Sequence, residues 1–223
     1  MGSILHHPNW PALDEDAFRV LAATQLLSAP VVAPMPVTGP APRPSDYDLN
    51  PSVRPADAPQ LRPAAVLVPI VIGAPLNVLL TQRTTHLAAH AGQIAFPGGK
   101  IEPQDETPLA AALREAQEEI GLDPGFVEPL GYVEPYETST GFLVTPVVAA
   151  VKPGFSLRPD PYEVADIFTV PLAFLLDEAN HRIDARDWRG AKRHFYAIPH
   201  EGRYIWGATA GIIRALHRRL TAA

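Results

Sequence analysis

Three glutamates, Glu115, Glu118 and Glu119, fall within five positions near the middle of the chain. The apolar residues around them recur at spacings of three and four, which predicts a helix over residues 107–120 with one apolar stripe. That stripe consists of Leu109, Leu113, Ala116 and Ile120. At about 100° per residue, the three carboxylates are expected to project together from the opposite, solvent-facing side. They also occupy the C-terminal half of the helix, where the helix dipole disfavours negative charge.

A solvated acidic face is one explanation of this cluster, and for an arbitrary helix it is the commoner one. Against it, Arg114 is the only basic residue between 107 and 122, so pairing along the helix leaves most of the charge uncompensated. Just upstream, Gly98 and Gly99 allow the backbone to approach a ligand closely. Carboxylates together with backbone oxygens are the ligands that Mg²⁺ and Mn²⁺ prefer. The alternative is therefore a site where divalent cations, and then substrate phosphate, hold the charge.

The same stretch, "FPGGKIEPQDETPLAAALREAQEEIGL", resembles the Nudix box, the signature of the Nudix hydrolase superfamily. The second half of that signature matches in full in "REAQEEIGL". In the first half, counting from Gly99 places the acid at Asp105, and one extra residue then separates it from Arg114. We expect Asp105, rather than Glu106, to pair with Arg114 and orient it.

Residues 79–99, "LLTQRTTHLAAHAGQIAFPGG", are similar to the upstream signature of one branch of that superfamily, the coenzyme A pyrophosphatases. One position departs from it, because Ala88 stands where the signature has an arginine. Residues 206–216, "WGATAGIIRAL", also resemble that branch, so the likeness covers roughly residues 64–220. It implies metal-dependent hydrolysis of the diphosphate of coenzyme A to 4'-phosphopantetheine and adenosine 3',5'-bisphosphate.

Ala88 keeps a second reading open, a Nudix hydrolase for a nucleotide sugar, NADH or a dinucleoside polyphosphate. A non-catalytic ligand-binding module is a third reading, which the intact carboxylates disfavour. For an enzyme, the resemblance implies that Glu115 and Glu119, followed by Glu118, bind Mg²⁺ or Mn²⁺. The carbonyl of Gly98 or Gly99 is expected to add a ligand.

The resemblance also implies catalytic roles for Glu115, Glu118 and Arg114 and a general base from a further glutamate. Glu163, in a loop leading into a strand, is our first candidate for that base. The alternatives are Glu134 and Glu137.

Three residues of the upstream segment are assigned to substrate binding. Arg83 lies at a strand end and can hold a phosphate through its fork of donors, although a surface ion pair explains it equally well. Gly98 and His90 complete the set. His86 lies four residues before His90, but no acid or cysteine accompanies the pair as a third ligand, so we do not predict zinc.

The rest of the chain supplies elements that can position these residues. Strands are predicted at 64–72, 77–83, 129–134, 142–151, 165–170 and 193–198, and further helices at 13–27, 171–179 and 207–220. Thr107 is the expected N-cap of the acidic helix, and Gly121 its left-handed C-terminal cap. This order predicts an α/β or α+β protein, and the resemblance implies the Nudix fold, a mixed sheet sandwiched between helices. We expect a Nudix domain at 64–223, preceded by a helix and a proline-rich extension at 1–63.

Composition limits the classes of partner and the cell compartment that fit this sequence. The 223 residues are 47% hydrophobic and carry a net charge of −6, which gives no basic field for nucleic acid. No run approaches the length of a membrane span, and the start lacks the pattern of a signal peptide. With no cysteine, the chain has no disulfide framework or thiolate metal site, which fits a cytoplasmic protein. The expected partner is a small nucleotide, and a homodimer is compatible with the sequence.

Overall fold

A mixed sheet forms the centre of the computed structural model, which describes residues 9–31, 43–55, 61–86, 90–188 and 191–222. Its two long strands, β1 (Arg62–Val71) and β7 (Phe142–Val151), run parallel along their whole length. The other pairs are antiparallel. They involve β2 (Asn77–Arg83), β3 (Ile94–Ala95), β4 (Gly98–Lys100), β5 (Val127–Tyr132), β6 (Tyr136–Glu137) and β8 (Val164–Pro171). The predicted mixed sheet is confirmed.

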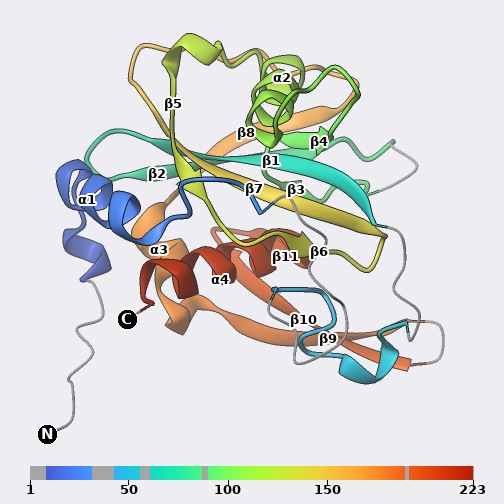
Figure 1. The fold of residues 1–223 in the computed structure, drawn as a ribbon. Helices are drawn as coiled ribbons and strands as arrows, with labels where there is room; N and C mark the ends of the chain where they lie inside the picture. The colour runs from blue at the N-terminus through green and yellow to red at the C-terminus, as the bar shows by residue number, and fades with distance from the viewer. Residues whose placement is uncertain (1–8, 32–42, 56–60, 87–89, 189–190, 223) are drawn as a thin grey trace, which may run out of the picture.

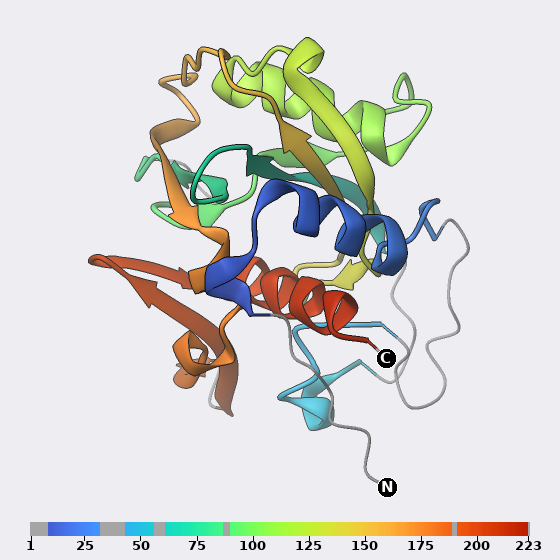
Figure 2. The ribbon, with the colours of Figure 1, turned by 90° about the vertical axis from the view of Figure 1, so that its left-hand side faces the viewer.

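Helices cover both faces of this sheet, as predicted (Figure 1). The acidic helix, α2 (Pro108–Ile120), lies on one face. The other face carries α4 (Ala208–Leu220), with α1 (Glu15–Gln25) beside it (Figure 2). The short helix α3 (Leu172–Leu176) packs on α4. A second antiparallel sheet on that side contains β9 (Arg182–Trp188), β10 (Ala191–His200) and β11 (Arg203–Trp206).

Small residues bring α2 close to the sheet. Ala111, Ala112 and Ala116 are all buried, and they pack with Ile120 over the apolar side chains of β1 and β2. The predicted ends are confirmed: Thr107 accepts a hydrogen bond from the backbone N–H of Ala110 at 3.1 Å, and Gly121 has a φ of 67°. Because alanine adds little thickness between helix and sheet, polar side chains at the edge of this face come close to the strands.

Several elements differ from the prediction. The helix expected at 171–179 ends at Leu176 and is followed by a 3-10 turn at Glu178–Asn180. The short strands β3, β4, β6 and β11 were not predicted, because two to four residues carry too little periodicity to be recognised. Strand β9 was also missed.

The proline-rich extension lies partly outside the described residues, since 32–42 and 56–60 are not among them. Its described part contains one 3-10 turn, Pro51–Val53, and packs against the domain. Ser45 forms a parallel bridge with Glu137, and Leu27 an antiparallel bridge with Tyr132. No helix in the described part of the chain is long and apolar enough to cross a membrane.

Candidate active site

The three glutamates of α2 do not share one solvent face, which corrects the sequence prediction. The exposed fraction of the side chain falls from 60% at Glu118 to 19% at Glu115 and 7% at Glu119. The helix is rotated from the expected orientation, so that Ala112, Ala116 and Glu119 lie on the buried side. Ala116 and Ile120 of the predicted stripe are buried, but Leu109 and Leu113 are only partly buried, and Ala111 and Ala112 lie against the sheet in addition.

Glu119 lies buried at the edge of the sheet, between two elements that come earlier in the chain. Its Oε2 accepts a hydrogen bond from the backbone N–H of Gly98 at 3.1 Å, and its Oε1 lies 3.4 Å from Nη1 of Arg83. Burial raises the pKa of Glu119 to about 7, because the Gly98 and Arg83 contacts only partly offset the loss of hydration. The carboxylate of Glu119 is therefore poised to titrate near neutral pH.

Glu115 packs its carboxylate directly against the backbone of β4. A Cβ atom on Gly99 would lie 2.5 Å from Cδ of Glu115, so only glycine leaves room for this approach. Gly98 is equally constrained, since its φ is 153° and a Cβ there would collide with the carbonyl oxygen of Ala65. Burial raises the pKa of Glu115 as well. The glycine pair thus holds two helix carboxylates, Glu115 and Glu119, against one short strand.

Arg114 connects the acidic loop before α2 with the helix itself. Its Nε and Nη2 donate to the two carboxylate oxygens of Asp105 at 3.0 and 2.9 Å, which confirms Asp105 as the partner. Its Nη1 lies 3.0 Å from both Glu115 and Glu118. The guanidinium lowers the pKa of Asp105. One arginine therefore fixes the rotamers of two acidic side chains on α2.

Among the candidate bases, Glu163 is the one brought to this cluster. Its Oε2 lies 3.6 Å from Nη2 of Arg83, and its charge contributes to the raised pKa values of Glu115 and Glu119. Glu134 is paired instead with Arg219 of α4 at 3.0 Å. Glu137 is fully buried and pairs with Arg43 and Arg54 of the extension.

Arg83 combines the two roles that the sequence left open. It makes ion pairs with Glu119 and Glu163, and it also lines a cavity of about 530 Å³. His90 and Gly98 line the same cavity. The Nδ1 of His90 lies 2.7 Å from Oε1 of Gln93, and its φ of 58° takes it out of any helix with His86. Ala88 lies outside the described residues.

Much of the cavity comes from segments that sequence reasoning did not connect with the site. One wall is the extension: Asp46 accepts hydrogen bonds from the hydroxyl of Tyr136 at 2.9 Å and from the backbone N–H of Ser139 at 2.8 Å. Asn50 exchanges hydrogen bonds with the backbone of His194 at 2.8 and 2.9 Å. The far end is formed by aromatic and basic residues of the second sheet. No local sequence pattern predicts that these residues line a cavity, because they come from segments far apart in the chain.

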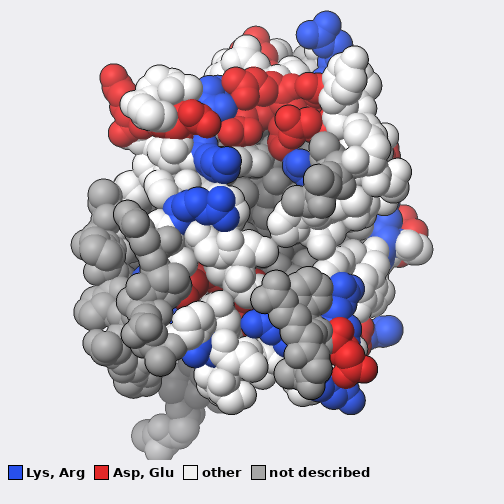
Figure 3. All heavy atoms as spheres, turned by 90° about the vertical axis from the view of Figure 1, so that its right-hand side faces the viewer, with Lys and Arg blue, Asp and Glu red and all other residues white. Residues whose placement is uncertain are grey.

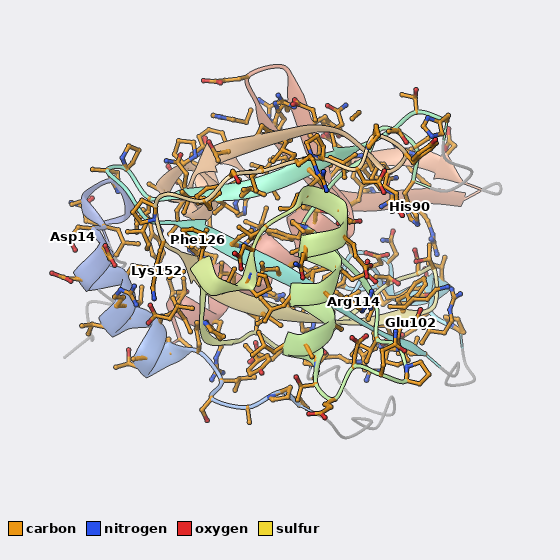
Figure 4. All side chains as sticks on the ribbon, turned by 90° about the horizontal axis from the view of Figure 1, so that it is seen from above. Asp14, His90, Glu102, Arg114, Phe126 and Lys152 are labelled. Atoms are coloured by element: carbon orange, nitrogen blue, oxygen red, sulfur yellow. The ribbon has the colours of Figure 1, made fainter. Side chains whose placement is uncertain are left out.

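The pictures agree with a charged site beside a hollow. Acidic side chains gather along the upper part of one face, and basic side chains lie below them around a central depression (Figure 3). Seen from above, Arg114, Glu102 and His90 lie toward the same end of the molecule, away from Asp14 and Lys152 (Figure 4). Among the described residues, no three His, Cys, Asp or Glu side chains converge closely enough to hold a metal ion. Arginines separate the carboxylates in this arrangement.

Comparisons with known proteins define the class. Residues 61–191 match the NUDIX domain. The chain is 44% identical over 156 residues to the uncharacterized Nudix hydrolase NudL of Escherichia coli (strain K12), covering 70% of this chain and 81% of that protein. It is 42% identical over 159 residues to the protein described in the same words from Photorhabdus laumondii, covering 71% and 85%. A crystal structure of a C. elegans Ap4A hydrolase binary complex is 22% identical, with a TM-score of 0.43, and covers 49% of this chain and 80% of that one.

The chain belongs to the Nudix hydrolase family. Such proteins hydrolyse nucleoside diphosphate derivatives, and in general they need divalent metal ions.

Proposed function

We propose that the protein hydrolyses the diphosphate of coenzyme A and its derivatives, with Mg²⁺ or Mn²⁺, to 4'-phosphopantetheine and adenosine 3',5'-bisphosphate. The observation that carries the hydrolytic site is the position of Glu115 and Glu119, which lie against Gly98 and Gly99, and Gly98 in turn lines the cavity. The upstream segment "LLTQRTTHLAAHAGQIAFPGG" supports coenzyme A as the substrate, through its similarity to the coenzyme A pyrophosphatases.

Two of the residues present, Glu115 and Glu119, fit a divalent cation that takes its other ligands from water and substrate phosphate. Glu115 and Glu119 offer carboxylate oxygens on either side of a glycine backbone, and both have raised pKa values because burial disfavours their charge. A cation there would bind Glu115 and Glu119 first, then Glu118 and the carbonyl of Gly98 or Gly99, competing with Arg114 and Arg83 for the same carboxylates. When bound, it supplies charge neutralisation at the diphosphate and a more acidic water.

The protein's own side chains have separate tasks in this proposal. Arg114, held by Asp105, fixes the carboxylate of Glu115. Arg83 faces the cavity and offers donors to a substrate phosphate. Glu163, whose side chain is 49% exposed to solvent and lies beside Arg83, accepts the proton of the attacking water in this proposal. His90 and Gly98 line the substrate side.

A panel of substrates tests the choice of coenzyme A. We expect kcat/KM for coenzyme A to exceed that for ADP-ribose, NADH, a nucleotide sugar and a dinucleoside polyphosphate by at least about tenfold, which is 1.4 kcal/mol of transition-state binding. Equal values across the panel would reject the coenzyme A assignment. Preference for one of the others would retain the Nudix hydrolase and assign it that substrate.

A further inference from the structure

Two arginines lie side by side on adjacent strands of the second sheet. In the antiparallel pairing of β9 and β10, Arg186 lies directly opposite Arg193. Directly opposed side chains share one face of the sheet, and like charges in that position destabilise it. Among the described residues, neither arginine makes an ion pair or a side-chain hydrogen bond, so no carboxylate neutralises the two charges, and Arg186 contacts only aromatic rings. An uncompensated cation pair on a cavity wall points to an anionic ligand.

Aromatic rings lie on the same face. Phe195 lies two positions after Arg193 on β10, so both side chains are on the same face of the sheet. The centroid of the Phe195 ring lies 5.1 Å from that of Trp206 on β11. The guanidinium of Arg186 lies 4.2 Å from the centroid of the Trp206 ring. All four residues line the cavity that begins at Gly98 and Arg83. The cavity therefore reaches from Arg83 and Gly98, which contact Glu119 of α2, to aromatic and cationic side chains on the second sheet.

Neighbouring acids are already engaged or point elsewhere. Asp184 accepts a hydrogen bond from the hydroxyl of Tyr204 at 2.5 Å. Asp187 lies opposite Lys192, one register position along, so that this pair lies on the other face of the sheet. Asp46, on the opposite wall, is occupied by Tyr136 and Ser139.

We propose that Arg186, Arg193, Phe195 and Trp206 form a subsite for a nucleoside that carries a phosphate of its own, separate from the diphosphate that is hydrolysed. The rings of Trp206 and Phe195 present a surface on which a base stacks. The two guanidinium groups bind a phosphate monoester dianion, whose oxygens match their fork of donors. Combined with the proposed function, on which it rests, this subsite takes the 3'-phosphoadenosine end of coenzyme A.

A pair of substrates that differ only in that phosphate tests the subsite. Wild-type protein should have a kcat/KM for coenzyme A at least about tenfold above that for 3'-dephospho-coenzyme A, since a charge-assisted contact contributes roughly that factor. In Arg193→Gln and Arg186→Gln, kcat/KM for coenzyme A should fall by about tenfold or more. The fall for 3'-dephospho-coenzyme A should be at least fivefold smaller, so that the preference is largely lost.

Lys192→Gln is the matched control, because it removes the same charge one residue away, on the other face of the strand and outside the cavity lining. It should keep the wild-type preference. Equal losses on both substrates in the arginine variants, or the same loss in Lys192→Gln, would overturn the proposal. Thermal unfolding of each variant shows whether Arg186→Gln has disturbed the packing on Trp206.

Calorimetric binding separates this proposal from the proposed function. Without metal, wild-type protein should bind adenosine 3',5'-bisphosphate about tenfold more tightly than adenosine 5'-monophosphate, and Arg193→Gln should bind both alike. If coenzyme A is not hydrolysed while this difference holds, the proposed substrate fails and the subsite stands. Equal affinities in wild-type protein would reject the subsite even if coenzyme A is hydrolysed.

Discussion

The guanidinium of Arg83 lies 3.4 Å from the carboxylate of Glu119, although 36 residues separate them in the chain. This contact joins the end of β2 to the last turn of α2, and Glu163 approaches the same guanidinium from the segment before β8. It provides long-range compensation for a carboxylate that lacks a basic neighbour on its own helix. Because Arg83 also lines the cavity, a substrate phosphate bound as we propose would compete with Glu119 for the same guanidinium.

The first prediction concerns Glu119. In Glu119→Gln, the amide oxygen can still accept the Gly98 N–H, but the anionic ligand is lost. We expect turnover to fall by about 100-fold or more, while the melting temperature stays level or rises, because a buried charge is removed. Steady-state kinetics with saturating metal and thermal unfolding measure the two effects. Turnover within twofold of wild type would remove Glu119 from the metal site.

The raised pKa of Glu119 also predicts a pH dependence of stability. Between the ordinary value of 4.5 and the folded value of about 7, the folded protein keeps a proton that the unfolded chain releases. This contribution is therefore fully present below pH 4.5 and is lost as the pH rises through 7. In chelator, the free energy of unfolding of wild-type protein should fall from pH 5.5 to pH 8 by about 2 kcal/mol more than that of Glu119→Gln. If the free energies of unfolding of the two proteins, measured with urea, changed equally with pH, the raised pKa of Glu119 would be contradicted.

Glu163 is predicted to act as the general base. Glu163→Gln should lower kcat by about 100-fold or more, with little change in stability because the side chain is half exposed. Glu134→Gln is the control, since Glu134 pairs with Arg219 instead. Its kcat should stay near the wild-type value. A large loss of kcat in Glu134→Gln, with kcat near the wild-type value in Glu163→Gln, would make Glu134 the general base instead.

The loop before α2 offers a test of how Arg114 is held. Asp105→Asn removes one charge from a bidentate pair whose carboxylate is only 4% exposed, so we expect a loss of about 2 kcal/mol in the free energy of unfolding. Turnover should fall by about tenfold, because Arg114 then orients Glu115 less firmly. Glu106→Gln, at the next position, should change neither quantity. Similar effects at both positions would indicate a general charge effect.

The extension is predicted to shape the cavity. Glu137→Gln leaves Arg43 and Arg54 without their shared carboxylate in a buried setting, which should cost about 3 kcal/mol of stability. Because Ser45, Asp46, Leu49 and Asn50 line the cavity, KM should rise more than kcat falls. Glu128→Gln, which breaks the partly exposed pair with Arg19, should cost under about 1 kcal/mol and leave KM unchanged. An unchanged KM in a folded Glu137→Gln variant would contradict this role.

The parts of the fold that the sequence predicted well are those with strong local signals. The bounds of β2 and β7 agree with the prediction, and α2 starts and ends where its caps indicated. The pairing of Asp105 with Arg114 was implied by the resemblance to the Nudix box, in which Asp105 has the expected distance from Gly99. Motif position likewise brought Glu115, Gly98 and Gly99 together.

The remaining features depend on contacts between distant segments. The burial of Glu119 follows from how closely the alanines of α2 approach the sheet, which periodicity alone does not specify. The cavity joins residues 45–50 to the strands of the second sheet, more than 130 positions later. That Arg186 lies opposite Arg193 follows only from the register of β9 and β10, which the sequence does not specify.

Product analysis tests the central claim most directly. Purified protein is incubated with coenzyme A and Mg²⁺, with Mn²⁺ in parallel, beside Glu119→Gln and a chelator control, and the products are resolved by chromatography. We predict equal amounts of 4'-phosphopantetheine and adenosine 3',5'-bisphosphate that require both the metal and Glu119. Coenzyme A that stays intact with either metal, or cleavage that survives Glu119→Gln, would contradict the account.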